Sequence, residues 1–283
     1  MKQSVITKKF PKITIITPSY NQEEYLERTI KSVIDQNYPN LEYLIFDGAS
    51  TDDSVKIIKK YQKYLKYWQS KKDQGQANAV EKGLNQSTGD ILCWLNSDDI
   101  LLPGSLNLLA TIFNRYPEIT WLTSQPFSVD SNNNIVQTGR FTGKLSSLIK
   151  LGFYHGKGLG FIPQEGTFWR RSLWIKSGKF IDKKYFCLDF KLWQRFAKYA
   201  SLVTLEAPLA AFRLNPNRKT NIMNHYYHDI HPLMAYIPKY FGIIGRIIHP
   251  IFHRICPHIY YDRYQYRWIF YKGPFFFPGI KTK

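Results

Sequence analysis

The sequence predicts an α/β fold in which a mostly parallel sheet is flanked by helices. Between Ile13 and about Tyr116, short apolar runs alternate with amphipathic stretches of helical spacing, which is the pattern of repeated βαβ units. Polar residues follow three of the apolar runs, and an open parallel sheet binds its ligands where its strands end. The first hundred residues therefore predict one crevice of nucleotide size, bordered by residues 17–21, 47–53 and 96–99.

The elements of this first part follow from local spacing. Leu26, Ile30 and Val33 recur at helical intervals, and Pro39 closes that segment. Pro103 is expected at the first position of another helix, because proline lacks the N–H that would be unsatisfied there. The expected strands are residues 13–17, 41–46, 67–70 and 91–95, and further helices are expected at residues 52–64 and 76–85.

The chain is long enough for one large domain with an appendage. It has 283 residues, of which 44% are hydrophobic, so a substantial core can be buried. Residues 1–116 are expected to bind the first ligand. Residues 117–214, with a helix at 188–199, are expected to complete the same domain and bind the second substrate. Residues 215–283 are basic and aromatic, and they predict a C-terminal tail.

Charge and cysteine content narrow the environment of the protein. A formal net charge of +18 favours anionic partners, namely nucleic acid, an acidic membrane face or phosphorylated small molecules. Three cysteines, widely spaced, favour a reducing compartment. Residues 236–255 are too often interrupted by charged residues to span a membrane, and residues 1–20 lack the pattern of a secretory signal. A cytoplasmic location is expected.

The adjacent Asp98 and Asp99 are the strongest local signal for chemistry. They follow an apolar strand, and two carboxylates at such a strand exit offer oxygen ligands to Mg²⁺ or Mn²⁺. A cation held there can neutralise a departing diphosphate. The alternative reading is a polar turn that caps the next helix.

Four segments of the chain carry a family resemblance through their order and spacing. They are ITIITPSYNQEEYLERTIKSVIDQNYPNLEYLIFDGASTDDS, DQGQANAVEKGLNQSTGDILCWLNSDD, IPQEGTFWRRSLWIKSGKF and LDFKLWQRF. Together they resemble glycosyltransferase family 2, whose members are inverting enzymes with the GT-A fold. The resemblance covers about residues 12–213 and implies a Rossmann-like nucleotide-diphospho-sugar transferase. It implies transfer of one sugar from a nucleotide-diphosphate sugar, most simply a UDP-sugar, to a glycan or lipid-linked acceptor in cell-surface polysaccharide synthesis.

The resemblance assigns roles to individual residues. Asp99 is implied as the direct metal ligand and Asp98 as a residue near the ribose or the metal. Without it, residues 19–23 would be read as a helix-entry turn and residues 47–52 as a β-turn. The implied nucleotide-sugar contacts are Thr17, Pro18, Tyr20, Asn21, Glu23, Asp47, Asp73, Gln76 and Asp98.

The resemblance also implies a catalytic base, Asp189, in the segment before Leu192 and Trp193. A carboxylate is needed there because the acceptor hydroxyl must lose its proton as it attacks. The alternative is a carboxylate that complements the helix dipole. Residues expected to contact the acceptor are Glu165, Trp169 and Arg213.

Several positions depart from the family pattern. Gly48 stands where many members have a second acidic residue, and Leu188 replaces the first acid of the pair that ends in Asp189. Asn78, Lys191 and Asn215 replace the Asp, Asp and His that close relatives often carry. These departures keep open a catalytically degenerate GT-A protein that acts as a binding subunit.

The remaining alternatives concern the basic tail. A nucleic-acid-binding protein would explain the tail but not the acidic strand ends, which repel phosphates, so no nucleic acid is expected. The Gln-x-x-Arg-Trp motif of processive members is absent, which favours transfer of a single sugar. The mixture of basic and aromatic residues instead predicts peripheral contact with an anionic membrane, on its cytoplasmic face.

Overall fold

The protein is described here by a computed structural model. The structure describes residues 10–156, 158–184, 187–214, 226–230, 251, 255–274 and 276–278. The strands are β1 (Ile13–Ser19), β2 (Leu41–Asp47), β3 (Tyr67–Ser70), β4 (Ile91–Trp94), β5 (Ile100–Leu101), β6 (Trp121–Ser124), β7 (Phe127–Val129), β8 (Ile135–Thr138), β9 (Thr167–Arg170), β10 (Val203–Leu205), β11 (Ala210–Arg213), β12 (His258–Asp262) and β13 (Arg267–Tyr271). The helices are α1 (Leu26–Ile34), α2 (Ser54–Tyr61), α3 (Gln76–Gln86), α4 (Ser105–Arg115), α5 (Ser146–Lys150), α6 (Arg171–Lys176) and α7 (Leu188–Phe196), with a 3₁₀ helix at Gln62–Tyr64.

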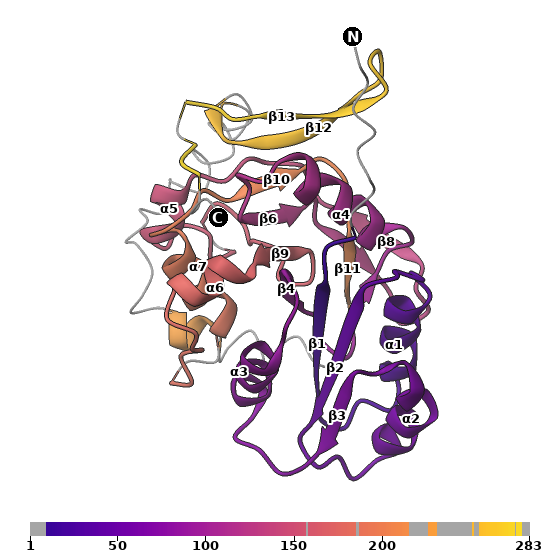
Figure 1. Cartoon of the computed structure of the whole chain (residues 1–283). Coiled ribbons are helices and arrows are strands. Elements are labelled where there is room, and N and C mark those ends of the chain that lie inside the picture. Colours follow the sequence, from indigo (N-terminus) through magenta and orange to yellow (C-terminus); the bar gives the residue numbers. More distant parts are fainter. Residues whose placement is uncertain are drawn as a thin grey trace.

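The described residues form one large sheet and one small sheet. The large sheet has nine strands in the order β13-β12-β10-β6-β9-β4-β1-β2-β3 (Figure 1). Its strands are parallel except at β9 and β13, which pair antiparallel with their neighbours. The small sheet has the order β5-β11-β7-β8. The predicted α/β class with a mostly parallel sheet is confirmed.

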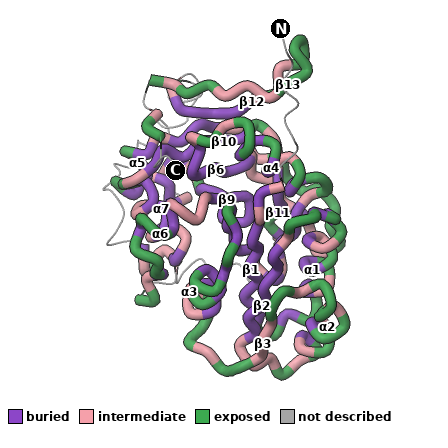
Figure 2. Tube along the Cα trace, viewed as in Figure 1, coloured by how far each residue is buried: buried purple, intermediate pink, exposed green. Residues whose placement is uncertain are grey.

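The central strands of the large sheet are buried on both faces, which explains their continuous apolar character. Along β1, Ile13 and Ile15 belong to one core cluster, which includes residues of α1 and α4, whereas Ile16 belongs to another, which includes residues of α3 and α7. Figure 2 shows the buried strands between helices whose outer faces are exposed. Gly83 allows α3 to pack closely on β1, because a Cβ at this position would lie 2.5 Å from Ile16 Cγ2.

Most predicted elements of the first hundred residues are confirmed, with one correction. The expected strand at residues 67–70 coincides with β3, and the expected helix at 52–64 is α2 followed by the 3₁₀ helix. The prediction that Pro103 opens a helix is wrong. Gly104 adopts a left-handed conformation (φ 79°), and α4 begins only at Ser105. Pro103 and Gly104 therefore form a turn between β5 and α4.

The C-terminal region is part of the large sheet rather than only an appended tail. Strand β12 pairs in parallel with β10, and β13 completes a hairpin with β12. Trp268 and Phe270 pack against the core, and the Tyr116 hydroxyl donates a hydrogen bond of 2.7 Å to the Trp268 carbonyl. Within the described part of the chain, no helix is long and apolar enough to cross a membrane. Residues 215–225, 231–250, 252–254, 275 and 279–283 of the predicted tail lie outside the described residues.

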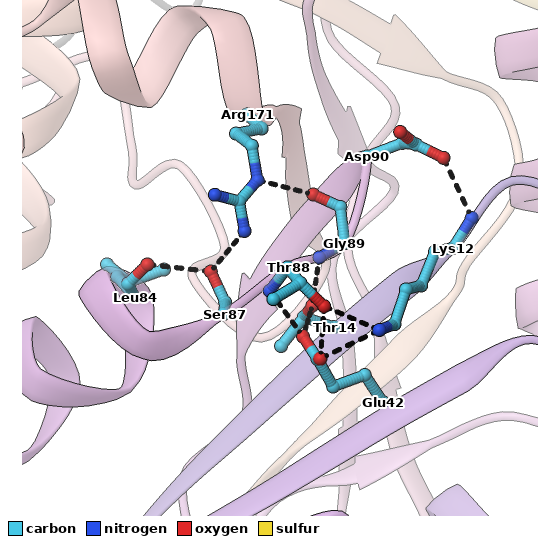
Figure 3. Close-up of polar contacts among 9 residues, drawn as sticks. All are labelled: Lys12, Thr14, Glu42, Leu84, Ser87, Thr88, Gly89, Asp90 and Arg171. Atoms are coloured by element: carbon cyan, nitrogen blue, oxygen red, sulfur yellow. Dashed lines mark hydrogen bonds and ion pairs between the residues drawn. The ribbon is translucent and has the colours of Figure 1, made fainter.

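A buried carboxylate joins the starting ends of β1, β2 and the loop before β4 (Figure 3). Glu42 accepts hydrogen bonds from the Thr14 hydroxyl at 2.6 Å and from the Thr88 backbone N–H at 2.7 Å. Lys12 Nζ lies 3.0 Å from Glu42 Oε1. Burial alone would raise the pKa of Glu42, but the hydrogen bonds from Thr14, Thr88 and Lys12 outweigh it and lower the pKa to about 2. This network therefore stabilises the fold above the ordinary glutamate pKa, and the contribution is lost as the pH falls towards 2.

Candidate functional site

The three polar clusters predicted from the sequence lie at one edge of the large sheet. Strand β1 lies between β2 and β4 and is parallel to both, so Ser19, Asp47 and Trp94 end neighbouring strands at the same edge. The Gly48 N–H donates to the Ser19 carbonyl at 2.8 Å, which extends the pairing of β1 and β2 into the loops. The predicted crevice position is therefore the place where these loops meet.

Two loops beyond β1 and β2 are tied to each other through side chains. The Asn21 backbone N–H donates to Ser50 Oγ at 2.8 Å, and Asn21 Oδ1 accepts from the Thr51 N–H at 2.9 Å. Glu23 Oε2 accepts from the Asp53 N–H at 2.8 Å. Asn21 has a positive φ of 49°, which asparagine tolerates better than most residues. In this structure, Asn21 and Glu23 shape the loops by these internal contacts.

Asp47 is buried and its carboxylate is engaged within the protein. It accepts hydrogen bonds from the Ser50 N–H at 2.9 Å, the Ser50 hydroxyl at 2.5 Å and the Ser70 hydroxyl at 2.6 Å. Thr17 and Pro18 are also buried, and Thr17 Oγ1 lies 3.0 Å from the Tyr43 hydroxyl. These three residues form the floor of the candidate site.

Tyr20 and Asp73 lie next to Gly48, the position where many family members have a second acidic residue. A Cβ at Gly48 would lie 3.4 Å from Asp73 Oδ1 and 3.4 Å from Tyr20 Cδ2. Asp73 Oδ1 also accepts from the Gly75 N–H at 2.8 Å, and the Tyr20 side chain is 58% exposed. The Asp73 carboxylate therefore lies beside the place where a second acidic residue would begin.

A chain of side-chain amides connects α3 to the Asp98–Asp99 turn, which follows β4. Gln76 Nε2 donates to Asn96 Oδ1 at 2.7 Å, and Asn96 Nδ2 donates to Asp99 Oδ2 at 3.2 Å and to Gln164 Oε1 at 3.0 Å. Gln164 Nε2 in turn donates to the Trp94 carbonyl at 2.6 Å. Asn96 lies in the predicted crevice segment 96–99 but was given no role of its own, and Gln164, which directly precedes Glu165, was not predicted as a site residue.

The Asp98–Asp99 turn is held from two other elements. The Thr29 hydroxyl of α1 lies 2.9 Å from the Ser97 carbonyl and 2.7 Å from the Asp99 carbonyl. Arg213 of β11 donates its backbone N–H to Asp99 Oδ1 at 3.0 Å and its Nε–H to the Asp98 carbonyl at 2.7 Å. Asp99 is only 1% exposed, whereas Asp98 is partly exposed. The turn is therefore held by α1 and β11 and does not cap the next helix, because the N-cap of α4 is Gly104 and no side chain caps it.

Acidic side chains from three segments share this buried region. Burial raises the pKa of Asp99 well above its usual range, and the negative charges of Asp98 and Glu165 raise it further. Burial also raises the pKa of Glu165 to about 7, with a contribution from the charge of Asp189. The pKa of Asp189, at the start of α7, rises to about 6 because its carboxylate is shielded from water. The site thus concentrates negative charge where water cannot fully solvate it.

This concentration of charge fits a divalent cation. Buried carboxylates that repel one another are stabilised when a cation lies between them or beside them. No group of three or more His, Cys, Asp or Glu side chains able to hold a metal occurs in the described ranges. Mg²⁺ commonly binds through one or two carboxylates, with water and substrate phosphates as its other ligands. Asp98 and Asp99 match that mode of binding.

All three residues expected at the acceptor are buried in the protein. Trp169 has no exposed surface, and its ring packs 5.7 Å from those of Trp94 and Trp193. Arg213 is 1% exposed, and its side chain is directed at the Asp98 turn. Trp169 therefore supports the sheet beneath α7, and Arg213 holds the acidic turn. Glu165 lies among the carboxylates described above.

Two of the residues that depart from the family pattern lie on helices that border the site. Asn78 lies in the first turn of α3, two residues after Gln76, and Lys191 lies on α7, two residues after Asp189. Asn215 lies outside the described residues.

Comparisons with known proteins identify the family of the chain. The model of the family described as "Glycosyl transferase family 2" matches residues 14–175. The "GalNAc(5)-diNAcBac-PP-undecaprenol beta-1,3-glucosyltransferase" of Campylobacter jejuni is 28% identical over 72% of this chain and 71% of its own length. An uncharacterized glycosyltransferase of Haemophilus influenzae is 23% identical over 76% of this chain and 69% of its own length.

Solved structures show the same fold. TarS of S. aureus in complex with UDP-GlcNAc has a TM-score of 0.60 and 16% identity, over 86% of this chain and 72% of that chain. The mannosyltransferase PcManGT of Pyrobaculum calidifontis, in complex with GDP-Man and Mn²⁺, has a TM-score of 0.56 and 16% identity, over 84% of this chain and 69% of that chain. The chain is a glycosyltransferase with the GT-A fold, and it belongs to glycosyl transferase family 2.

Proposed function

We propose that the protein transfers a single sugar from a UDP-sugar to a hydroxyl of a glycan or lipid-linked acceptor, with inversion at the anomeric carbon. The observation that carries this proposal is the group of buried and partly buried acidic residues beside the nucleotide-sized edge of the sheet. Asp98 and Asp99 offer metal ligands, and Asp189 has a pKa of about 6, so it is mostly ionised at neutral pH. Asp98 and Asp99 can therefore stabilise the leaving diphosphate through a cation, while Asp189 can accept the proton of the nucleophile.

In the proposed reaction, Asp189 accepts the proton of the acceptor hydroxyl as its oxygen attacks the anomeric carbon. The bond between that carbon and the diphosphate oxygen breaks, and the diphosphate leaves with the bonding electrons. A divalent cation held by Asp98 and Asp99 would neutralise the charge that develops on the diphosphate. Tyr20 and Asp73 are proposed to contact the nucleotide, with Asp47, Asn21 and Glu23 holding the loops behind them.

The choice of donor and acceptor rests on the relatives. The donors in the two structural neighbours are a UDP-sugar and a GDP-sugar, which supports a nucleotide sugar as the class. The Campylobacter jejuni relative is named for an undecaprenol-linked acceptor, which supports a lipid-linked glycan here and a role in cell-surface polysaccharide synthesis.

Calorimetric titration with UDP, GDP and dTDP, each with Mn²⁺ and with a chelator, tests the donor site. UDP is expected to bind tightest, and about tenfold or more weaker once the metal is removed, because the diphosphate charge is then unscreened beside Asp98 and Asp99. Equal UDP binding with and without metal would exclude the proposed cation. If none of the nucleotides bound, the degenerate binding subunit would become the better description. Salt-sensitive RNA or DNA retention in a filter assay would support a nucleic-acid-binding role instead.

We further propose that the β12–β13 hairpin contacts the anionic cytoplasmic face of a membrane. Its turn carries Tyr264 and Tyr266, which are 96% and 82% exposed, between Arg263 and Arg267. Figure 1 shows the hairpin at the outer edge of the large sheet, beyond β10. Exposed tyrosines next to arginines suit the interface of an anionic bilayer, where the rings enter the headgroup region and the cations meet lipid phosphates.

Substitution of both tyrosines, as Tyr264→Ser with Tyr266→Asn, is expected to weaken binding to phosphatidylserine-containing vesicles severalfold. Asparagine suits position 266 because Tyr266 has a positive φ of 49°. Vesicle co-sedimentation at physiological salt measures the effect. Tyr64→Ser is the matched control, since Tyr64 is 51% exposed near the opposite edge of the sheet. Unchanged vesicle binding by the double variant would show that the hairpin does not contact the membrane. No vesicle binding by the native protein would contradict the membrane proposal as a whole.

A further inference from the structure

Arg213, at the end of β11, forms hydrogen bonds with two turns that lie far apart in the sequence. Besides the bonds to the Asp98–Asp99 turn, Nη1 donates to the Asp130 carbonyl at 2.6 Å and Nη2 donates to Asn133 Oδ1 at 2.6 Å. Asp130 and Asn133 belong to the turn between β7 and β8. One buried guanidinium therefore bridges the acidic turn and the turn of a hairpin more than thirty residues later.

We propose that Arg213 is a positioning residue through which the β7–β8 turn fixes the Asp98–Asp99 turn in the geometry that binds the cation and the donor diphosphate. This inference rests on the proposed function for its metal. The coupling between the β7–β8 turn and the Asp98–Asp99 turn is expected in the metal-free protein as well. It assigns Arg213 a role towards the donor side of the reaction instead of the acceptor contact expected from the sequence.

The charge of Arg213 suits this position. A guanidinium stays protonated in proteins, and its hydrogen-bond partners described here are two backbone carbonyls and an amide oxygen. Burial and the charge of Arg28 lower the pKa of Arg213 from its ordinary value, and the charges of Asp99 and Asp98 oppose part of that shift. The cation of Arg213 thus offsets part of the repulsion in the acidic turn without occupying its outer face.

The β7–β8 turn is well suited to hold the guanidinium in one place. Its backbone is braced by Asp130, whose Oδ1 accepts from the Asn132 N–H at 2.8 Å and from the Asn134 N–H at 2.9 Å. Asn133 has a φ of 69°. The Asp130 carbonyl and the Asn133 amide oxygen are therefore presented to Arg213 as a preformed pair of acceptors.

The β8 strand of the hairpin adds little packing, whereas Val129 of β7 packs with Ile100 and Ala211. All four residues of β8 are exposed, with Ile135 at 67% and Val136 at 54%. On its other side, the Arg213 guanidinium lies 4.9 Å from the centre of the buried Tyr25 ring. Arg213 is thus clamped between the loop before α1 and the hairpin turn, and the acidic turn depends on that clamp. A turn that is already ordered loses less entropy when it binds a ligand, so its affinity is higher.

Asn133→Gly tests the coupling without disturbing the core. Glycine adopts a φ of 69° without strain, so the change removes the acceptor of Arg213 Nη2 and leaves the turn backbone intact. The Mn²⁺ concentration for half-maximal UDP binding is expected to rise about threefold to tenfold, which corresponds to the net contribution of one ordinary hydrogen bond. Asn132→Gly is the matched control, because Asn132 contacts Asp130 through its backbone N–H.

A second measurement needs neither metal nor activity. Amide hydrogen exchange of residues 97–100 in the metal-free protein is expected to be severalfold faster in Asn133→Gly than in the native protein or in Asn132→Gly. Unchanged exchange and an unchanged Mn²⁺ curve would overturn the inference. Faster exchange in a protein whose UDP binding never depended on metal would uphold the coupling while contradicting the proposed function. Arg213→Lys, which keeps the charge and loses the fork, is expected to give the larger effect if it folds.

Discussion

Asp99→Asn is expected to abolish Mn²⁺-dependent UDP binding and to lower sugar transfer by about a thousandfold or more, because the cation loses its anionic ligand. The same substitution is expected to stabilise the metal-free protein. Burial and neighbouring charges raise the pKa of Asp99, so its ionised form is disfavoured in the folded state. An amide of the same shape removes that cost. It keeps an oxygen for the Arg213 N–H and gives up the bond from Asn96.

The pH dependence of this stabilisation follows from the direction of the shift. A group with a raised folded-state pKa binds more protons when folded, so stability falls as the pH rises from the unfolded pKa through the folded one. The gain in melting temperature of Asp99→Asn should therefore be present at about pH 8 and shrink as the pH is lowered through the raised pKa. Thermal unfolding and calorimetry measure the two effects, with the exposed Asp53→Asn as control. Native-like UDP binding by Asp99→Asn would show that the metal lies elsewhere.

Asp189→Asn is expected to lower kcat by about a thousandfold while UDP binding stays unchanged, since the base acts on the acceptor and not on the donor nucleotide. In the native enzyme Asp189 must be ionised, and its pKa is about 6. The rate should therefore rise with pH by about tenfold per unit below pH 6 and level off above it. The residual rate of the variant should lack this rise.

Initial-rate measurements across pH, at saturating metal, test the assignment of the base. Asp182→Asn is the matched control, because this carboxylate precedes α7 and its described contact is with the Lys184 N–H. A full rate in Asp189→Asn would move the base to another group, and Glu165, whose pKa is about 7, would be the next carboxylate to replace. A parallel loss of UDP binding would instead indicate that α7 supports the donor site.

The sequence predicts the first half of the fold well because its local signals agree with one another. In β1 every residue is buried, and the spacing of Leu26, Ile30 and Val33 leaves one apolar face for α1. Pro103 failed as a helix-start signal because Gly104 follows it. A glycine that favours a left-handed conformation turns the chain before the helix can begin.

Parts of the candidate site depend on contacts between distant segments, which no local pattern reveals. The bond from Asn96 to Gln164 joins residues separated by 68 positions, and that from Arg213 to Asp98 joins residues separated by 115. The family resemblance marked Arg213 but not the direction of its side chain. Its inward orientation is set by acceptors on the β7–β8 turn, which carries no sequence signal for the site.

The order in which the large sheet is completed has a consequence for synthesis of the protein on the ribosome. Strand β10 lies between β6 and β12 in space, yet β12 begins 53 residues after β10 ends, at His258. Chains grow from the N-terminus, so a nascent polypeptide can assemble β1 to β10 around the acidic site while one side of β10 has no hydrogen-bonding neighbour. An open strand edge is a template for pairing with other chains. The β12–β13 hairpin, which is translated after β10, therefore closes the edge that would otherwise be available to a neighbouring nascent chain.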